Sequence, residues 1–111
     1  MNVVILNGVL SRAAERRTLP SGDTLVAYEV TTRDEDGRAD SVPVSWSPPE
    51  GKGMYDAGEA VVVTGRVRRR FYRAGGATQS RTEVVADAVV RVSDTRRVQR
   101  LLEKAVATVV T

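Results

Sequence analysis

The chain has 111 residues, of which 41% are hydrophobic and 28% charged, and its formal net charge at pH 7 is +3. This length and balance indicate one folded domain with its own core rather than a disordered chain. The sequence contains neither histidine nor cysteine, which removes the usual zinc, haem and iron–sulfur ligands, the commonest general base, and the Ser-His and Cys-His nucleophile pairs. We therefore expect a protein that is not an enzyme and that carries no metal or other cofactor.

The sequence predicts neither a membrane-spanning helix nor a signal peptide. No apolar run reaches the length of a membrane-spanning helix, and the start of the chain, Met-Asn-Val-Val-Ile-Leu-Asn-Gly, lacks the basic and long apolar regions of a signal peptide. A cysteine-free composition fits the reducing cytoplasm. We expect a cytoplasmic protein with no membrane partner.

The first two strands are predicted on either side of a turn. Residues 3–10 carry apolar side chains at every second position, with Gly8 as a bend. Residues 25–32 alternate in the same way and put Tyr28 among the core side chains. The polar residues 11–18 are interpreted as a connection that leads to a Pro-Ser-Gly turn.

A third strand, residues 41–47, follows a charged loop. The loop, residues 33–40, holds four acidic residues around Gly37, and we interpret them as solvated turn residues rather than catalytic carboxylates. Pro43 has no backbone N–H and therefore indicates an edge or irregular strand. Glycines in the next segment, residues 50–56, argue against a long helix there.

Residues 59–73 carry the most informative pattern in the chain. The valines at 61–63 suit a strand, and Gly65 stands at the change from apolar to charged residues, as a bulge or bend would. If the strand runs straight, alternation gathers four side chains on one face: Arg66, Arg68, Arg70 and Tyr72. Such a row of arginines beside an aromatic ring suits a phosphate backbone with a stacked base. The alternative is a solvated strand face with Phe71 or Tyr72 folded into the core.

The chain ends with a returning strand and a helix. The Ala-Gly-Gly-Ala sequence at 74–77 predicts a hairpin tip, and residues 79–92 return as a fifth strand with regular alternation. After Asp94, a suitable N-cap, the apolar spacing of three and four predicts an amphipathic helix over 94–109. Five short strands with a weak connector predict an all-β fold closed into a small barrel, since closure removes exposed sheet edges.

An ordered set of short motifs resembles the bacterial single-stranded-DNA-binding protein family. The matches, in chain order, are Met1-Asn2 with Val4, Leu6, Gly8, Leu10 and Arg12; Pro20-Ser21-Gly22; Val30-Thr31-Thr32; Gly65-Arg66-Val67-Arg68; and Thr82-Glu83-Val84-Val85-Ala86. The resemblance implies a five-stranded Greek-key barrel of the OB-fold class at residues 1–92, as the nucleic-acid-binding domain. Residues 93–111 would be a C-terminal amphipathic helix that packs on the barrel or on an oligomer partner, in place of the family's long acidic-tipped tail. The resemblance also implies a homo-oligomer, either a dimer or a tetramer, in which the apolar first strand is a candidate pairing edge.

Two of the family's stacking aromatics have counterparts in this chain. They correspond to Trp46, near the end of the third strand, and to Tyr72, with Phe71 beside it. Asp36 and Asp40 stand at two other aromatic positions, where an acidic group loses roughly 1–3 kcal/mol of stacking and repels phosphate. The alternative role for Trp46 is that of a core or interface anchor.

The resemblance thus predicts largely sequence-independent binding of single-stranded DNA, in the nucleoid, in replication, recombination or repair. The predicted binding residues are Arg12, Arg16, Arg17, Arg33, Trp46, Arg66, Arg68, Arg70, Phe71, Tyr72 and Arg73. One alternative is a factor resembling primosomal replication protein N, which would also bind a replication-restart helicase. Another is an OB-fold protein-interaction module with weak or lost DNA binding. No small-molecule substrate is expected.

Overall fold

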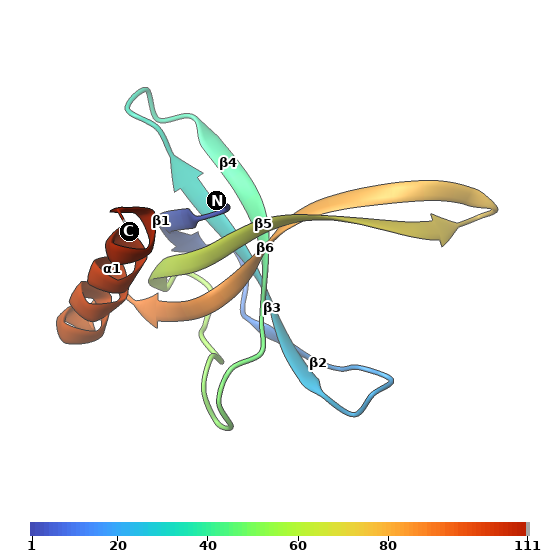
Figure 1. The fold of residues 1–111 in the computed structure, drawn as a ribbon, viewed down its shortest axis with the longest axis horizontal. Helices are drawn as coiled ribbons and strands as arrows, with labels where there is room; N and C mark the ends of the chain where they lie inside the picture. Colours follow the sequence, from blue (N-terminus) through green and yellow to red (C-terminus); the bar gives the residue numbers. More distant parts are fainter. Residues whose placement is uncertain (111) are drawn as a thin grey trace.

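The chain folds into a closed β-barrel with one helix on its outside (Figure 1). The structure is a computed structural model and describes residues 1–110. Its elements are β1 (Val4–Leu10), β2 (Glu15–Thr18), β3 (Thr24–Arg33), β4 (Ala39–Trp46), β5 (Ala60–Ala74), β6 (Ala77–Arg91) and α1 (Thr95–Val110). The strand order is β1-β5-β6-β4-β3-β2, and an additional pairing of β1 with β3 closes the sheet. The predicted barrel with a C-terminal helix is therefore confirmed.

One strand, β2, was not predicted. Its four residues pair with β3 in register, from Glu15 opposite Ala27 to Thr18 opposite Thr24, and all four are exposed. A strand with both faces in solvent has no alternation of apolar residues, so its sequence resembles a polar connection. The hairpin forms because the Pro-Ser-Gly turn brings the chain back, with the Leu19 N–H donating to the Asp23 carbonyl oxygen at 2.8 Å.

The barrel core is built mainly from β-branched residues that alternate along the strands. The largest fully buried side chains are Leu10, Val26, Val30, Val61, Val63 and Val89. Tyr28 joins them, as predicted, and its hydroxyl donates a hydrogen bond of 2.8 Å to the carbonyl oxygen of Gly53. That bond ties the long β4–β5 connector to the end of the barrel, so the connector is held although it contains no helix.

A β-bulge sits where β5 and β6 leave the barrel. Thr64 pairs with Ala88 but Gly65 pairs with Ala86, so Asp87 is an extra residue on β6. A Cβ on Gly65 would lie 2.2 Å from the Val85 carbonyl oxygen, which explains why glycine is needed at this close approach. A bulge was predicted at Gly65, and the register does shift there, but the extra residue lies on β6 and not on β5. Regular alternation along β6 is wrong, because the extra residue brings Val89 to the same core as Val84.

Helix α1 packs on the outside of β5 and β6 (Figure 1). Asp94 caps it: the Arg97 backbone N–H lies 3.4 Å from the Asp94 Oδ1 that accepts its hydrogen bond. Ala105 is buried against the barrel, whereas Val106, Val109 and Val110 remain exposed. In residues 1–110, no helix is long and apolar enough to cross a membrane.

Candidate nucleic-acid interface

The far ends of β5 and β6 form a long hairpin, residues 66–83, that we call the arm. Figure 1 shows it leaving the barrel along the longest dimension of the molecule, which is 46 Å. Its strands stay in register out to Ala74 opposite Ala77. Gly75 and Gly76 close the tip with φ values of 59° and 79°, which suit the tight two-residue turn of a twisted hairpin. The predicted hairpin tip is confirmed.

The arm is the most basic part of the chain. It contains one acidic residue, Glu83, and six arginines, namely Arg66, Arg68, Arg69, Arg70, Arg73 and Arg81. The whole chain has a net charge of only +3, so the rest of it is net acidic. Positive charge concentrated on one projecting element attracts a polyanion and orients its approach.

One face of the arm carries the predicted row of arginines. Because β5 itself has no extra residue, its alternation continues past Gly65 and keeps the row together, across from Val85, Glu83, Arg81 and Gln79 of β6. Glu83 is only 7% exposed, and its Oε1 lies 2.8 Å from Arg68 Nη2 and 3.6 Å from Arg70 Nη1. Arg68 and Arg70 therefore also neutralise a buried carboxylate.

Both predicted aromatic rings of the arm lie in solvent. Phe71 is 66% and Tyr72 is 46% exposed, so neither folds into the core. They point to opposite faces, because they are neighbours on one strand. The Arg69 guanidinium lies over the Phe71 ring, 5.2 Å from its centroid, which is a cation–π arrangement. Each face of the arm thus combines arginines with an accessible ring.

Asn2 fixes the root of the arm. Its side-chain amide donates to the Val67 carbonyl oxygen at 2.7 Å and accepts from the Val67 N–H at 2.9 Å. These two bonds extend the β1–β5 ladder beyond Val4, its last paired residue. The arm consequently leaves the barrel from a supported base.

The four arginines predicted to flank the site lie apart from the arm's arginine row. Arg12 pairs with Glu29, and Arg17 lies 3.2 Å from Glu15. Arg33 donates to the Gly37 carbonyl oxygen at 3.0 Å in the β3–β4 hairpin. Arg16 lies on β2 opposite Val26. Arg12, Arg17 and Arg33 thus have partners within the chain, and all four arginines lie outside the arm.

Trp46 is not on the accessible surface, which corrects its predicted role as a stacking ring. It is 6% exposed and belongs to the core cluster, and its indole N–H donates to the Asp87 carbonyl oxygen at 3.1 Å. The bulge makes this bond available, because the extra residue of a bulge leaves the regular ladder. The structure thus supports the alternative interpretation of Trp46 as a core anchor.

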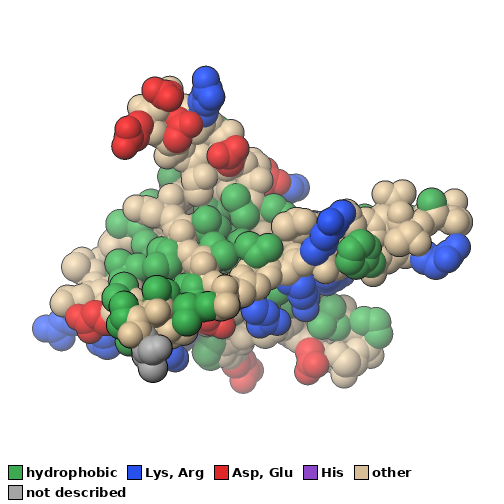
Figure 2. Space-filling model, turned by 45° about the horizontal axis from the view of Figure 1, so that its top comes forward, with side chains coloured by type: hydrophobic (Ala, Val, Ile, Leu, Met, Phe, Trp, Pro, Cys, Tyr) green, Lys and Arg blue, Asp and Glu red, His purple; other side chains and the backbone are tan. Residues whose placement is uncertain are grey.

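The β3–β4 hairpin presents an acidic tip. Asp34, Glu35, Asp36 and Asp40 are exposed there, and Figure 2 shows acidic side chains gathered at one end of the molecule, away from the arm. Asp34 Oδ1 accepts hydrogen bonds of 2.9 Å from the backbone N–H groups of Asp36 and Arg38. This tip would repel phosphate, as expected from Asp36 and Asp40.

Sequence reasoning missed two arginines of the arm. Arg69 lies on the opposite face from the predicted row, over Phe71. Arg81 lies directly across the hairpin from Arg70. The position of Arg81 follows only from the register of the two strands, which the bulge and the tip turn determine together.

Comparison with known proteins identifies the class to which this barrel and arm belong. The model of the Single-strand binding protein family matches residues 1–92. A structural relative, from "Plasmodium falciparum SSB complex with ssDNA", superposes with a TM-score of 0.63 at 18% sequence identity, over 77% of this chain and 85% of that one. A search of curated proteins finds no significant match.

The chain therefore belongs to the single-strand binding protein family, and its fold is an OB-fold with a C-terminal helix. Both the predicted family and the predicted fold are confirmed.

Proposed function

We propose that this chain binds single-stranded DNA without catalysis and with little sequence preference, mainly along the arm. The observation that carries the proposal is the combination, on one projecting hairpin, of six arginines with two solvent-exposed rings, Phe71 and Tyr72. Family membership supports the same activity.

Two physical effects would hold the strand. Arginine guanidinium groups contact phosphates and release the condensed counterions, which makes the affinity fall with added salt. Exposed aromatic rings stack on unpaired bases, and every base has a face for this. A duplex keeps its bases stacked inside and offers only the first effect.

We place this activity in replication, recombination or repair, at the nucleoid, and in a homo-oligomer. Two surfaces could join the copies. The first is β1, where Ile5 and Val9 are 45% and 43% exposed. The second is the uncovered face of α1, which includes Val106 and Val109.

The proposal is tested by fluorescence anisotropy with labelled oligo-dT and a matched duplex over a range of salt concentrations. The test variant replaces Arg66, Arg69 and Arg81 with alanine, since these three lie outside the Glu83 ion pairs. We expect tight binding of oligo-dT by the wild type. In the variant, the slope of log K against the logarithm of the salt concentration should become shallower by about 2, because each of the three lost phosphate contacts contributes roughly 0.7. Tyr72→Ala should weaken binding by roughly 1–3 kcal/mol.

A matched control removes the same number of charges elsewhere, by replacing Arg38, Arg96 and Arg100 with alanine. These residues are exposed and lie outside the arm. If the control loses as much affinity as the arm variant, binding depends on net charge and not on the arm. If the wild type does not bind oligo-dT at low salt, the proposed function is wrong.

The acidic tip favours a second candidate, a protein-interaction module, because Asp34, Glu35, Asp36 and Asp40 suit a basic protein partner better than DNA. A replication-restart helicase is one such partner, as for primosomal replication protein N. Retention of a protein partner that depends on the tip, together with absent oligo-dT binding, would favour this candidate.

A further inference from the structure

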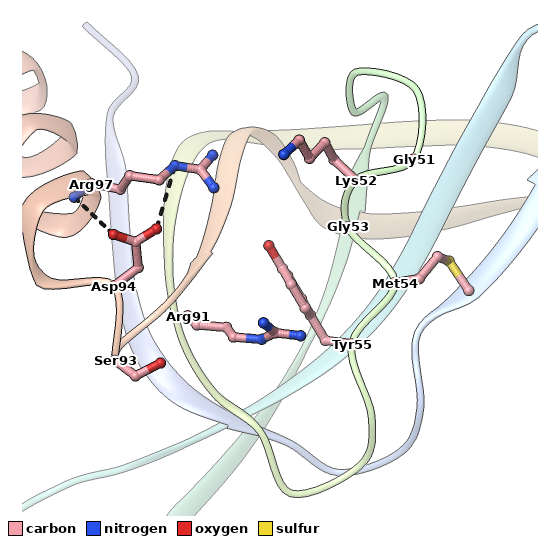
Figure 3. A pocket seen from close by; sticks show the side chains of 9 residues that line it. All are labelled: Gly51, Lys52, Gly53, Met54, Tyr55, Arg91, Ser93, Asp94 and Arg97. Atoms are coloured by element: carbon pink, nitrogen blue, oxygen red, sulfur yellow. Dashed lines mark hydrogen bonds and ion pairs between the residues drawn. The ribbon is translucent and has the colours of Figure 1, made fainter.

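A second basic site lies away from the arm, between the β4–β5 connector and the start of α1 (Figure 3). It is a cavity of about 550 Å³. Its charged lining residues are Lys52 from the connector, Arg91 from the end of β6, and Asp94 and Arg97 from the start of the helix. Tyr55 forms its inner wall.

The walls of this cavity are fixed by the fold. The Tyr55 carbonyl oxygen accepts from the Ala14 N–H at 2.9 Å, and the Tyr55 hydroxyl donates to the Val89 carbonyl oxygen at 2.8 Å. Arg91 is held by Glu59, with Nε and Oε1 3.0 Å apart, and lies 5.0 Å from the Tyr55 ring centroid. The cavity is thus formed before any ligand arrives.

Its electrostatics favour an anion. Figure 3 shows the cationic ends of Lys52 and Arg97 reaching toward each other from opposite walls. The only carboxylate of the lining, Asp94, caps the helix and lies 3.9 Å from Arg97 Nε, which is a long ion pair. Within residues 1–110, no ion pair engages Lys52. Cationic groups that approach one another repel, and an anion bound between them lowers this electrostatic repulsion.

The start of α1 strengthens this preference. Its first turn contains Arg97, which lines the cavity, and no acidic residue. The N-terminal end of a helix carries a partial positive charge, so the helix dipole disfavours an arginine there. Binding of a negatively charged group at this end gains from both the dipole and the side chains.

We infer that this cavity binds a phosphate group, with Lys52, Arg91 and Arg97 as its donors. The inference rests on the proposed function, in which the phosphate belongs to the backbone of a single strand that extends beyond the arm. The Tyr55 ring has Arg91 on it and Tyr28 6.4 Å away, so the site has no open ring for stacking a base. It would therefore add affinity for long strands without a preference for sequence.

The length of the DNA strand distinguishes binding at this cavity from binding at the arm. We would measure oligo-dT of roughly 8 nucleotides, within the usual range for one OB-fold, and of roughly 35 nucleotides. The variant Lys52→Ala with Arg97→Ala should bind the short strand as the wild type does. Its affinity for the long strand should fall about 5- to 10-fold. The slope of log K against the logarithm of the salt concentration should become shallower by about 1.4, because each of the two lost contacts contributes about 0.7.

The matched control is Arg96→Ala with Arg100→Ala, which removes the same total charge as the variant, from positions on α1 that lie outside the cavity lining. Circular dichroism and buried Trp46 fluorescence report whether each variant is folded. Equal long-strand losses in variant and control would overturn the inference, as would an unchanged long-strand affinity in the folded variant. Failure of the short strand to respond to the arm variant would count against the proposed function instead.

Titration with inorganic phosphate tests whether the bound phosphate group belongs to the DNA backbone or to a free phosphate compound. Wild type and variant are titrated with phosphate and followed by NMR shifts of the connector and of the start of α1. Phosphate shifts that the variant loses, together with reduced long-strand affinity, support a site for the DNA backbone. Phosphate shifts without any effect on long strands would overturn the DNA assignment and show a site for a free phosphate compound.

Discussion

Glu83 shows that the arginines of the arm are not equivalent. Its carboxylate is buried, and Arg68 and Arg70 are its two cationic partners, whereas Arg66 takes part in no ion pair among residues 1–110. A buried carboxylate needs a partner, because an uncompensated charge away from water is costly. Arg68 therefore contributes to stability, and Arg66 is the member of the row most available to a ligand.

Removal of Arg68 should destabilise the fold. We expect Arg68→Ala to lower the free energy of unfolding by roughly 1–3 kcal/mol, because Glu83 loses its closer partner. Arg66→Ala should change stability by less than about 0.5 kcal/mol. Combining Arg68→Ala with Glu83→Gln should recover part of the loss, since the uncompensated charge is gone. Urea unfolding of the wild type, Arg68→Ala, Glu83→Gln and the double variant measures this, with Arg66→Ala as the control, and strictly additive effects of the two single changes would contradict the coupling.

Burial raises the pKa of Tyr28, and the nearby Tyr55 raises it further. The folded state therefore holds the Tyr28 proton more tightly than the unfolded state, whose pKa is about 10. The stability linked to this proton is complete below about pH 10 and is lost as the pH rises above it.

This linkage can be measured by urea unfolding between pH 7 and pH 11. Tyr28→Phe should cost roughly 0.5–1.5 kcal/mol at pH 7, because its hydrogen bond to Gly53 is lost. Above about pH 10 the variant should lose stability less steeply than the wild type. Equal slopes in the two proteins would show that Tyr28 is not the group responsible.

At the scale of elements, the bulge at Asp87 connects three features. It brings Val89 into the core together with Val84, it offers its carbonyl oxygen to the Trp46 indole, and it marks the place where the arm leaves the barrel. Gly65 permits this arrangement, because it has no Cβ to collide with the opposite backbone.

Gly65→Ala should consequently disturb the junction of barrel and arm. The new Cβ would meet backbone atoms of Val85 and Ala86, which cannot rotate away, so we expect a loss of roughly 1–3 kcal/mol in unfolding free energy. Gly37→Asn is the control: the site has open space and a φ of 80°, which asparagine tolerates. Thermal unfolding compares them, and a neutral Gly65→Ala would mean that the bulge is not constrained as described.

The whole molecule separates its charges and its apolar surface. The arm is basic and the β3–β4 tip acidic, while exposed apolar residues remain on β1 and α1 (Figure 2). Exposed apolar residues that recur along one element are typical of protein–protein contacts. We propose that copies associate through β1 or α1, which would leave the arm free for DNA.

The oligomer is tested by size-exclusion chromatography with light scattering. We expect a mass that is a multiple of the 12.0 kDa chain. Ile5→Glu should reduce it if copies meet at β1, whereas Val106→Glu should do so if they meet at α1, because a charge in an apolar contact is costly. A monomeric wild type at micromolar to millimolar concentration would contradict the proposed homo-oligomer.

Several features could be predicted from the sequence because they depend on local chemistry. Alternating valines specify the strands, Gly75 and Gly76 specify the tip, and Asp94 specifies the start of the helix. The arginine row was also predicted correctly, because alternation along a strand follows from backbone geometry alone. The exposed β2 and the extra residue in β6 left no such signal.

The barrel, the helix, the arm and its charge could all be predicted from the sequence, because they follow from periodicity, turn residues and composition. Tertiary structure alone decided which side chains are accessible. Trp46 and Tyr72 look alike as candidate stacking rings in the sequence, yet Trp46 is buried and Tyr72 is exposed. The tertiary structure also places Lys52 and Arg97, which are 45 positions apart in the sequence, in the lining of one cavity. Burial and the proximity of residues that are far apart in the sequence depend on how distant segments pack, and no local sequence pattern specifies this packing.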